Sequence, residues 1–413
     1  MRRFACLILV VVAVTGTALA QWTKPAPVPY TPRALNEYDA YCPVWRTDAT
    51  FHSTVRLKNS LDVSPIDATV TLYMADGNPY VLPTVHLARG GVATVDVNAA
   101  LAQAPLSVRP HLSQFGSASV KYNYDWQGVV QASMSILDLT RSLEYMPSFV
   151  FPAKPSLTDQ ANAAPAQTSD GLWWRYALSS AGWVALANTT DKAVGAEVTV
   201  SGLSIPMRRS IVLPAHGSTM LDLNDFFAGE SALVGGLHVA YTGTWGSVQV
   251  AGGLQDTAKG FSTDMPLAWN QPPADAAGPR QLAAAGVMIN DQDPLLNFPA
   301  SVRFTPYAYF RNISSTPRTL HFTVYYMPSR TAASLPVPDL TLQPGETEPL
   351  PIAVLTQKLT QVQDFTLAYS YDGYWGDILA GIGATGQGGN YVFPVVPSAA
   401  FKGGTQGFPL LVG

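Results

Sequence analysis

The chain has few charged residues and almost no cysteine. Of its 413 residues, 13% are Asp, Glu, Lys or Arg, about half of the roughly 25% usual in globular proteins. The formal net charge is −4, so no positive field attracts nucleic acid, and we exclude nucleic acid as a partner. Beyond the first twenty residues no apolar run reaches the roughly 18 residues of a spanning helix. We therefore expect no transmembrane span in the mature chain.

The first twenty residues are typical of a secretory signal peptide. Arg2 and Arg3 form a basic start, a short apolar run follows, and Ala18 and Ala20 form a small-x-small cleavage site before Gln21. No cysteine follows that site directly, so we expect no lipid anchor. The predicted location of the mature chain is secreted, periplasmic or at the cell surface.

Removal of this segment would take Cys6 with it and leave Cys42 as the only cysteine. One cysteine cannot form a disulfide within its own chain, so stability must come from apolar cores. Cys42 lies between Tyr41 and Pro43, where we expect a half-buried structural thiol. A nucleophile and an intermolecular crosslink are the alternatives.

The sequence also lacks the common catalytic and metal-binding patterns. There is no His-Glu-x-x-His and no Gly-x-Ser-x-Gly. Asp291 and Asp293 are two apart, but the Gly and the distant Glu of an EF-hand loop are missing, which favours a polar turn. Asp138 and Asp256 are interpreted as turn residues. The six histidines recur at no common position and are interpreted as isolated surface or turn residues: His52, His86, His111, His216, His238 and His321. We predict no enzyme and no catalytic, cofactor-binding or metal-binding residue; a secreted hydrolase is an alternative.

One pattern, by contrast, occurs three times. An alternating apolar run ends in Asn59, Asn188 and Asn312, at spacings of 129 (188 − 59) and 124 (312 − 188) residues. Each copy then contains a Tyr followed by a Trp and a Gly. A period of this length is one domain, so the sequence predicts a tandem array.

Within each copy the apolar residues alternate, as Val70, Leu72 and Met74 do, and each run ends in a turn signal. Short alternating strands separated by turns are typical of antiparallel β-sandwiches, which makes the predicted class all-β. Single helical turns are expected near residues 98–103 and 223–228, with Asn98 and Asn224 as caps. The predicted segments are a signal peptide (1–20), a Pro-rich lead (21–42), repeat one (43–152), a linker (153–169), repeat two (170–269), a linker (270–284), repeat three (285–397) and a tail (398–413).

Three elements of the second copy support a resemblance. They are Asn188 after the first core strand, the apolar-Pro-x-x-Gly turn at 213–217, and the strand ending Leu221-Asp222-Leu223. With these, the chain resembles bacterial immunoglobulin-like extracellular repeats of the cell-adhesion-related (CARDB-like) type. The resemblance implies three immunoglobulin-like sandwiches with structural, adhesive or carbohydrate-facing roles, and it brings no catalytic residue.

The repeated aromatic residues are the candidate ligand-binding positions: Tyr122, Trp126, Tyr241, Trp245, Tyr369 and Trp375. Flat rings at a hairpin stack on sugars or on partner surfaces, or they fill the sandwich core. The Tyr–Trp spacing is four in the first two copies and six in the third, which predicts that both rings share one face of a strand. This shared face favours a packing role in the core, and a binding face is the alternative.

Asn188 and Asn312 also begin glycosylation sequons, but a strand-end or turn role explains them more simply. The predicted function is a secreted, non-enzymatic structural or adhesive protein of the cell surface, with a surface protein or polysaccharide as partner. A carbohydrate-binding protein is the alternative, and an outer-membrane β-barrel is a lesser one.

Overall fold

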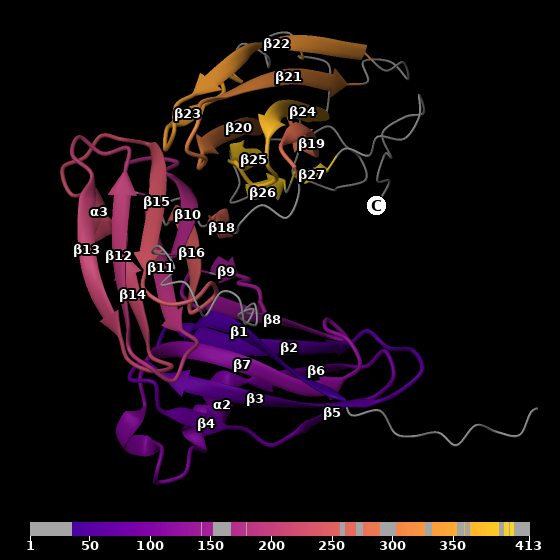
Figure 1. Cartoon of the computed structure of the whole chain (residues 1–413), viewed down its shortest axis with the longest axis vertical. Helices are drawn as coiled ribbons and strands as arrows, with labels where there is room; N and C mark the ends of the chain where they lie inside the picture. Colours follow the sequence, from indigo (N-terminus) through magenta and orange to yellow (C-terminus); the bar gives the residue numbers. More distant parts are fainter. Residues whose placement is uncertain are drawn as a thin grey trace, which may run out of the picture. The chain divides into compact units, whose positions relative to one another are not determined.

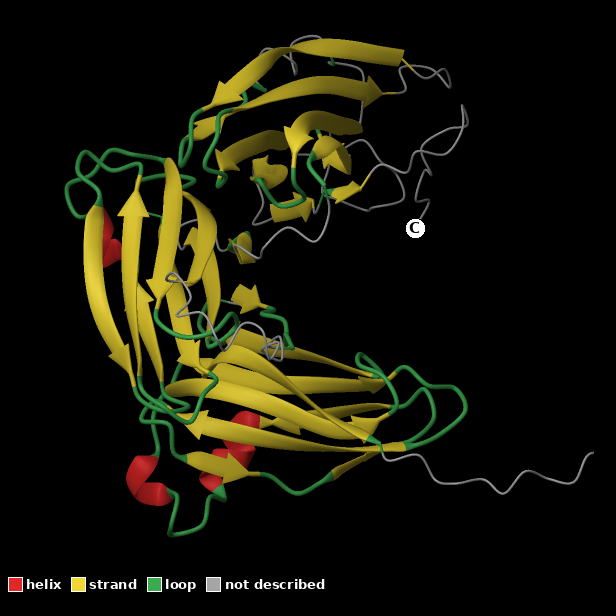
Figure 2. Ribbon diagram, in the orientation of Figure 1, coloured by secondary structure: helices red, strands yellow, loops and turns green. Residues whose placement is uncertain are grey.

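The fold is that of a computed structural model, drawn in Figure 1. It describes residues 35–141, 143–151, 167–178, 180–256, 261–269, 276–289, 303–326, 333–352, 359, 364–387, 392–395 and 397–399. Within this part of the chain, helix is confined to α2 (Val97–Ala102), the 3-10 turn η1 (Arg109–His111) and α3 (Asn224–Phe227), as Figure 2 shows. The predicted all-β class is confirmed.

The strands fall into three successive groups along the chain. The first contains β1 (Asn36–Arg46), β2 (Phe51–Asn59), β3 (Ile66–Met74), β4 (Pro79–Val81), β5 (Val85–Leu87), β6 (Val92–Asp96), β7 (Phe115–Tyr124), β8 (Val130–Asp138) and β9 (Leu143–Tyr145). The second contains β10 (Gln167–Trp174), β11 (Ala181–Asn188), β12 (Val194–Ser201), β13 (Met207–Leu213), β14 (Ser218–Asp222), β15 (Val234–Tyr241), β16 (Val248–Asp256), β17 (Phe261–Asp264) and β18 (Leu267–Trp269). The third contains β19 (Gly278–Met288), β20 (Arg303–Asn312), β21 (Arg318–Tyr326), β22 (Ala333–Leu342), β23 (Thr347–Pro349), β24 (Asp364–Gly373), β25 (Ile378–Gln387), β26 (Val392–Val395) and β27 (Ser398–Ala399).

Each group forms two sheets, which we call a sheet pair. The four-stranded sheets run β6-β2-β8-β9, β14-β11-β16-β17 and β23-β20-β25-β26. The larger sheets run β4-β3-β7-β1 with β5 also on β3, β13-β12-β15-β10-β18 and β22-β21-β24-β19-β27. The three pairs therefore share one strand order, with two differences in the first: β4 and β5 together take the place of β13 and β22, and no described strand takes the place of β18 and β27. None of these sheets closes on itself within the described residues.

The two sheets of a pair face each other across an apolar core. In β3, Val70, Leu72 and Met74 are fully buried, while the residues between them are partly exposed, as the two-residue period predicted. Val55 and Leu57 of β2 belong to the same core cluster although they lie in the other sheet. Burial of one such side chain stabilises the fold by about 1.5–3 kcal/mol. The second and third pairs have corresponding clusters, so the fold is sandwich-like.

Three predicted boundaries are wrong, because strands begin earlier than expected. β1 starts at Asn36 inside the predicted Pro-rich lead, β10 at Gln167 inside the first linker, and β19 at Gly278 inside the second. In β19 small residues occupy inward positions; Ala284, for example, is fully buried opposite Leu367. Because these inward residues are small, the sequence of β19 showed no alternation of large apolar residues. The signal peptide and the segments 152–166, 290–302 (with Asp291 and Asp293) and 400–413 lie outside the described residues.

Both predicted helical turns are present, but their caps differ. Asp96 caps α2, because its carboxylate accepts a hydrogen bond from Ala99 N at 2.9 Å. Asn98 instead accepts from Ser53 N and so joins α2 to β2. Asn224 is the first residue of α3, and its backbone N donates to Asp222. At the N-terminus of each of these two helices, a backbone N–H therefore donates to an aspartate that lies one or two residues before the helix.

Cys42 is fully buried, not half-buried as expected. The segment after β9 covers it, with the Sγ 4.0 Å from the carbonyl oxygen of Pro147 and 3.3 Å from that of Val44. Burial raises the pKa of this thiol to about 12, so the thiolate needed for nucleophilic attack is not formed at neutral pH. In the described part of the chain, no helix is both long and apolar enough to cross a membrane.

Candidate functional site

The three repeated asparagines are buried at the ends of β2, β11 and β20. The Nδ2 of Asn188 donates to the carbonyl oxygens of Lys192 and Pro214 at 2.6 and 2.7 Å. Asn59 and Asn312 donate in the same way to carbonyls on both sides. Each amide therefore joins its own turn to the loop before the next strand of its sheet, the strand-end role considered from the sequence. A glycan on Asn188 or Asn312 is incompatible with this buried geometry.

The turn opposite each asparagine has one residue in the left-handed region. Gly90, His216 and Gly345 have φ values of 59°, 53° and 76°. Glycine adopts this conformation freely, whereas His216 adopts it at a steric cost. Two contacts hold the imidazole: Asp191 at 2.7 Å and the ring of Tyr73 at 4.9 Å between centroids. The turn at His216 is the apolar-Pro-x-x-Gly turn expected from the sequence at 213–217.

The repeated tyrosines point inward and support the turn that follows them. The hydroxyl of Tyr122 accepts from Gly128 N at 2.7 Å, and that of Tyr241 from Gly246 N at 3.3 Å. In the third pair Tyr371, four residues before Trp375, holds this place, and its hydroxyl donates to Tyr374 O at 3.1 Å. The choice of Tyr369 was therefore wrong by two residues. Tyr369 is a separate core residue, 3% exposed.

The repeated tryptophans lie on the outside of these turns. Trp126 is 54% exposed and Trp375 is 46% exposed, while Trp245 is partly exposed. The predicted shared face is therefore wrong: the strands end before each Trp, so strand alternation no longer applies. Tyr124 packs edge-on against Trp126 with centroids 4.7 Å apart, and the guanidinium of Arg280 lies 4.9 Å from the Trp375 ring centroid. These turns present flat rings to solvent.

The histidines are not isolated, which corrects the interpretation from sequence. Each lies 2.7–3.4 Å from an aspartate: His52 with Asp96, His86 with Asp67, His111 with Asp76, His216 with Asp191, His238 with Asp170 and His321 with Asp339. No group of three metal-ligating side chains occurs within the described ranges. Asp138 is the turn residue predicted, since it accepts from Thr140 N at 2.9 Å and Arg141 N at 3.1 Å.

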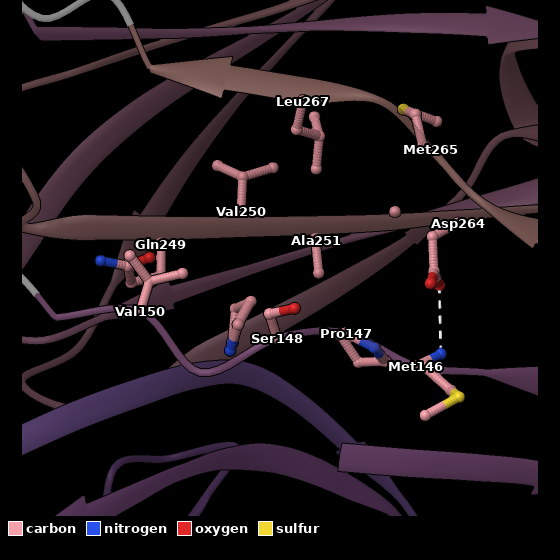
Figure 3. Close-up of a pocket in the computed structure, with 12 residues that line it drawn as sticks. Met146, Pro147, Ser148, Val150, Gln249, Val250, Ala251, Asp264, Met265 and Leu267 are labelled. Carbon is pink, nitrogen blue, oxygen red and sulfur yellow. Dashed lines mark hydrogen bonds between the residues drawn. The ribbon is translucent and has the colours of Figure 1, made fainter. Parts of the chain in front are cut away.

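A cavity of about 300 Å³ lies between the first and second sheet pairs (Figure 3). One wall is formed by Pro43, Met146, Pro147, Ser148 and Val150. The other is formed by Gln249, Val250, Ala251, Gly252, Asp264, Met265 and Leu267, from β16, β17, the turn after it and β18. The lining is mostly apolar with a few polar groups, which is the usual composition of a small-molecule site.

β16 lines the cavity and has two buried faces. Val250 belongs to the core of the second pair, whereas Ala251 belongs to the core of the first. At Gly253 a Cβ would lie 2.5 Å from the Tyr145 ring, so only glycine lets this ring approach. The Tyr145 hydroxyl bonds to Gln255 Oε1 at 2.5 Å, and its ring meets Trp183 edge-on at 5.3 Å. These contacts join β9 of the first pair to β11 and β16 of the second.

Two polar side chains lie toward opposite ends of the cavity in Figure 3. Gln249 is 1% exposed, and its Oε1 has no hydrogen-bond partner among the described residues. An unsatisfied buried acceptor costs about 1–3 kcal/mol. Asp264 pairs with Gly253, four residues along β16 from Gln249, which corresponds to roughly 13 Å at the usual strand rise.

Asp264 is accessible to solvent at the cavity wall, but protein surrounds it on most sides. That crowding, to which the nearby charge of Glu144 adds, raises the pKa of the carboxyl to about 6. One oxygen accepts from Met146 N at 3.2 Å. At neutral pH Asp264 is therefore an incompletely compensated anion.

The junction between the second and third sheet pairs has a different composition. Arg311 of β20 lies 3.4 Å from the carboxylate of Asp170 in β10, and both side chains are 5% exposed. Nη1 of Arg311 also donates to Gly345 O at 2.6 Å. A Cβ at Gly236 would lie 1.8 Å from Nη1 of Arg311, so this glycine makes room for the guanidinium.

Sequence reasoning missed the cavity and the Asp170–Arg311 pair. Their residues come from strands more than a hundred positions apart, and none of them forms a local motif. The free acceptor of Gln249 depends on packing and leaves no trace in composition. No protein-family model, curated protein or solved structure matches the chain.

Proposed function

We propose that the protein is a secreted, non-enzymatic structural or adhesive component of the cell surface, built from three tandem immunoglobulin-like sandwiches. The observation that supports this most is the strand order that the three sheet pairs share, which differs only at the edges of the larger sheet of the first pair. Tandem sandwiches joined by packed junctions suit a spacer that presents loops to a partner. A surface protein or a polysaccharide is the proposed partner.

The alternative, carbohydrate binding, rests on the exposed rings. Trp126 and Trp375 are about half exposed at equivalent turns, and a flat indole face in that position stacks on sugar rings. The buried tyrosines beneath them hold the turn geometry. Under this alternative Trp126, Trp245 and Trp375 bind, and Tyr122, Tyr241 and Tyr371 position them.

The test compares the wild-type protein with a Trp126/Trp245/Trp375→Ala variant on glycan arrays and isolated cell walls. A matched control is Leu106→Ala, because Leu106 is 77% exposed and lies away from the turns. Loss of binding in the triple variant only, with an unchanged far-UV spectrum, supports the carbohydrate alternative. Unchanged binding to cell walls supports adhesion through another surface. Turnover that a His→Ala or Asp→Ala change abolishes would contradict the non-enzymatic proposal.

The location is tested separately. Mass spectrometry of the mature protein is expected to place its N-terminus at Gln21. Fractionation is expected to recover it from the periplasm, the surface or the medium. An uncleaved chain retained in the cytoplasm would contradict this part of the proposal.

A further inference from the structure

We propose that the cavity between the first and second sheet pairs binds an elongated organic amine. One ammonium group lies on the carboxylate of Asp264, and a second hydrogen-bond donor meets Oε1 of Gln249. This inference goes beyond the proposed function, since it uses none of the residues of the tryptophan turns.

The polar groups determine the sign and the donor character of the ligand. Asp264 is the only charged residue that lines the described cavity, and Glu144 adds negative potential nearby. The buried Oε1 of Gln249 accepts hydrogen bonds and donates none. Both ends therefore require a donor, and the Asp264 end requires a cation. Carboxylates and phosphates do not fit this arrangement.

The walls determine the middle of the ligand. Pro147, Ala251 and Leu267 present apolar surface between the two polar ends, where Ser148 also lies, and Met146 and Met265 lie at the Asp264 end (Figure 3). A chain of methylene groups suits such walls, and methionine side chains adapt to its shape. The separation of roughly 13 Å along β16 corresponds to a linear molecule and not to a compact one. The volume of about 300 Å³ equals the share of about ten water molecules in the liquid, which such a chain would displace.

The experiment measures the binding of three probes of equal chain length by calorimetry at about pH 7.5: octanediamine, octylamine and octanoate. We expect octanediamine to bind most tightly, octylamine more weakly, and octanoate not at all. Asp264→Asn is expected to weaken binding of both amines about ten- to a hundredfold, because a hydrogen bond to a charged group is lost. Gln249→Leu is expected to reduce the affinity for octanediamine to that for octylamine. Asp67→Asn, at an exposed carboxylate in β3, is the matched control and is expected to change nothing.

The pH dependence gives a second measurement on the unaltered protein. Near pH 5 the Asp264 carboxyl is mostly protonated, since its pKa is about 6, and amine binding is expected to weaken. Glu144, the thiol of Cys42 and the hydroxyl of Tyr145 are the other titratable groups that interact with this carboxyl. Burial raises the pKa of the thiol and of the Tyr145 hydroxyl, so neither of these two groups becomes charged between pH 5 and pH 7.5.

Two results would overturn the proposal. One is the absence of binding by either amine to wild-type protein that melts cooperatively. The other is equal affinity of wild type and Asp264→Asn. A peptide with a single lysine distinguishes the source of the amine. If the peptide binds with an affinity similar to that of octylamine, the site is assigned to a lysine side chain of a protein partner. If only the free amines bind, the site is assigned to a small molecule. Both outcomes support the amine chemistry.

Discussion

The junction between the first and second sheet pairs combines neutral hydrogen bonds with a cavity, whereas the junction between the second and third encloses an ion pair. At the first, Tyr145 bonds to Gln255 and the anion, Asp264, remains accessible. At the second, Asp170 and Arg311 are both almost fully buried. The first junction therefore tolerates change at its polar groups, while the second requires both charges together.

An aromatic cluster adds to the difference. Trp174 lies 5.6 Å from both Tyr307 and Tyr309, with the Tyr309 ring stacked at 24°. Tyr307 is buried within the core cluster of the second pair, although it belongs to β20 of the third. The second junction is thus continuous with a hydrophobic core, and we expect it to be the more rigid of the two.

The largest expected effect is at the buried ion pair. Arg311→Ala removes the buried cation that pairs with the carboxylate of Asp170, and we expect a loss of about 3–5 kcal/mol in the free energy of unfolding. Arg208→Ala breaks an exposed pair with Glu197 and is expected to cost about 0–1 kcal/mol. Urea denaturation of both variants measures the difference. Equal losses would show that the second junction is not held by its charges.

A smaller effect is expected where glycine makes room for the guanidinium. Gly236→Ala places a methyl group on the Arg311 side chain, and overpacking of this kind costs about 1–3 kcal/mol. The control is Gly195→Ala, because the nearest atom to a Cβ there, Oγ1 of Thr242, is 3.8 Å away. Thermal unfolding compares the two. A Gly236→Ala variant as stable as its control would mean that Arg311 rotates away without cost.

At the first junction Tyr145→Phe removes only the hydroxyl that bonds to Gln255. The expected loss is about 0.5–1.5 kcal/mol, because the ring still packs against Trp183. Chemical denaturation measures the loss. If it exceeded the loss in Arg311→Ala, the order of strength proposed for the two junctions would be reversed.

The smallest effect has the opposite sign and depends on pH. The pKa of Asp264 is about 6 in the folded protein and near 3.9 when unfolded. The folded state thus holds the proton more tightly, so the stability that this group contributes is present below pH 4 and is lost as the pH rises through 6. Asp264→Asn is therefore expected to stabilise the protein by about 1 kcal/mol at pH 8, after allowance for solvent screening, and by nothing near pH 4. Melting temperatures at both pH values test this, and destabilisation at pH 8 would contradict it.

The sequence predicted what is local and repeated. Val70, Leu72 and Met74 revealed their strand, and the Pro-x-x-Gly pattern revealed the turn at 213–217. The sequence did not predict the start of β19, where the inward residues are small. It also did not predict the side chain direction of Trp126, because the strand ends before that residue. The cavity and the Asp170–Arg311 pair were beyond it, because they depend on how strands of different sheet pairs pack.

The buried asparagines have a consequence for how the protein is produced. In a eukaryotic secretory pathway, an oligosaccharyltransferase acts on the nascent chain, in competition with folding, at Asn188-Thr189-Thr190 and Asn312-Ile313-Ser314. Once the chain folds, the amide nitrogens are enclosed by backbone carbonyls and no longer accept a sugar. A chain glycosylated first could not then bury that amide and would be retained by quality control. The yield in such a host would therefore depend on which of the two processes reaches each asparagine first.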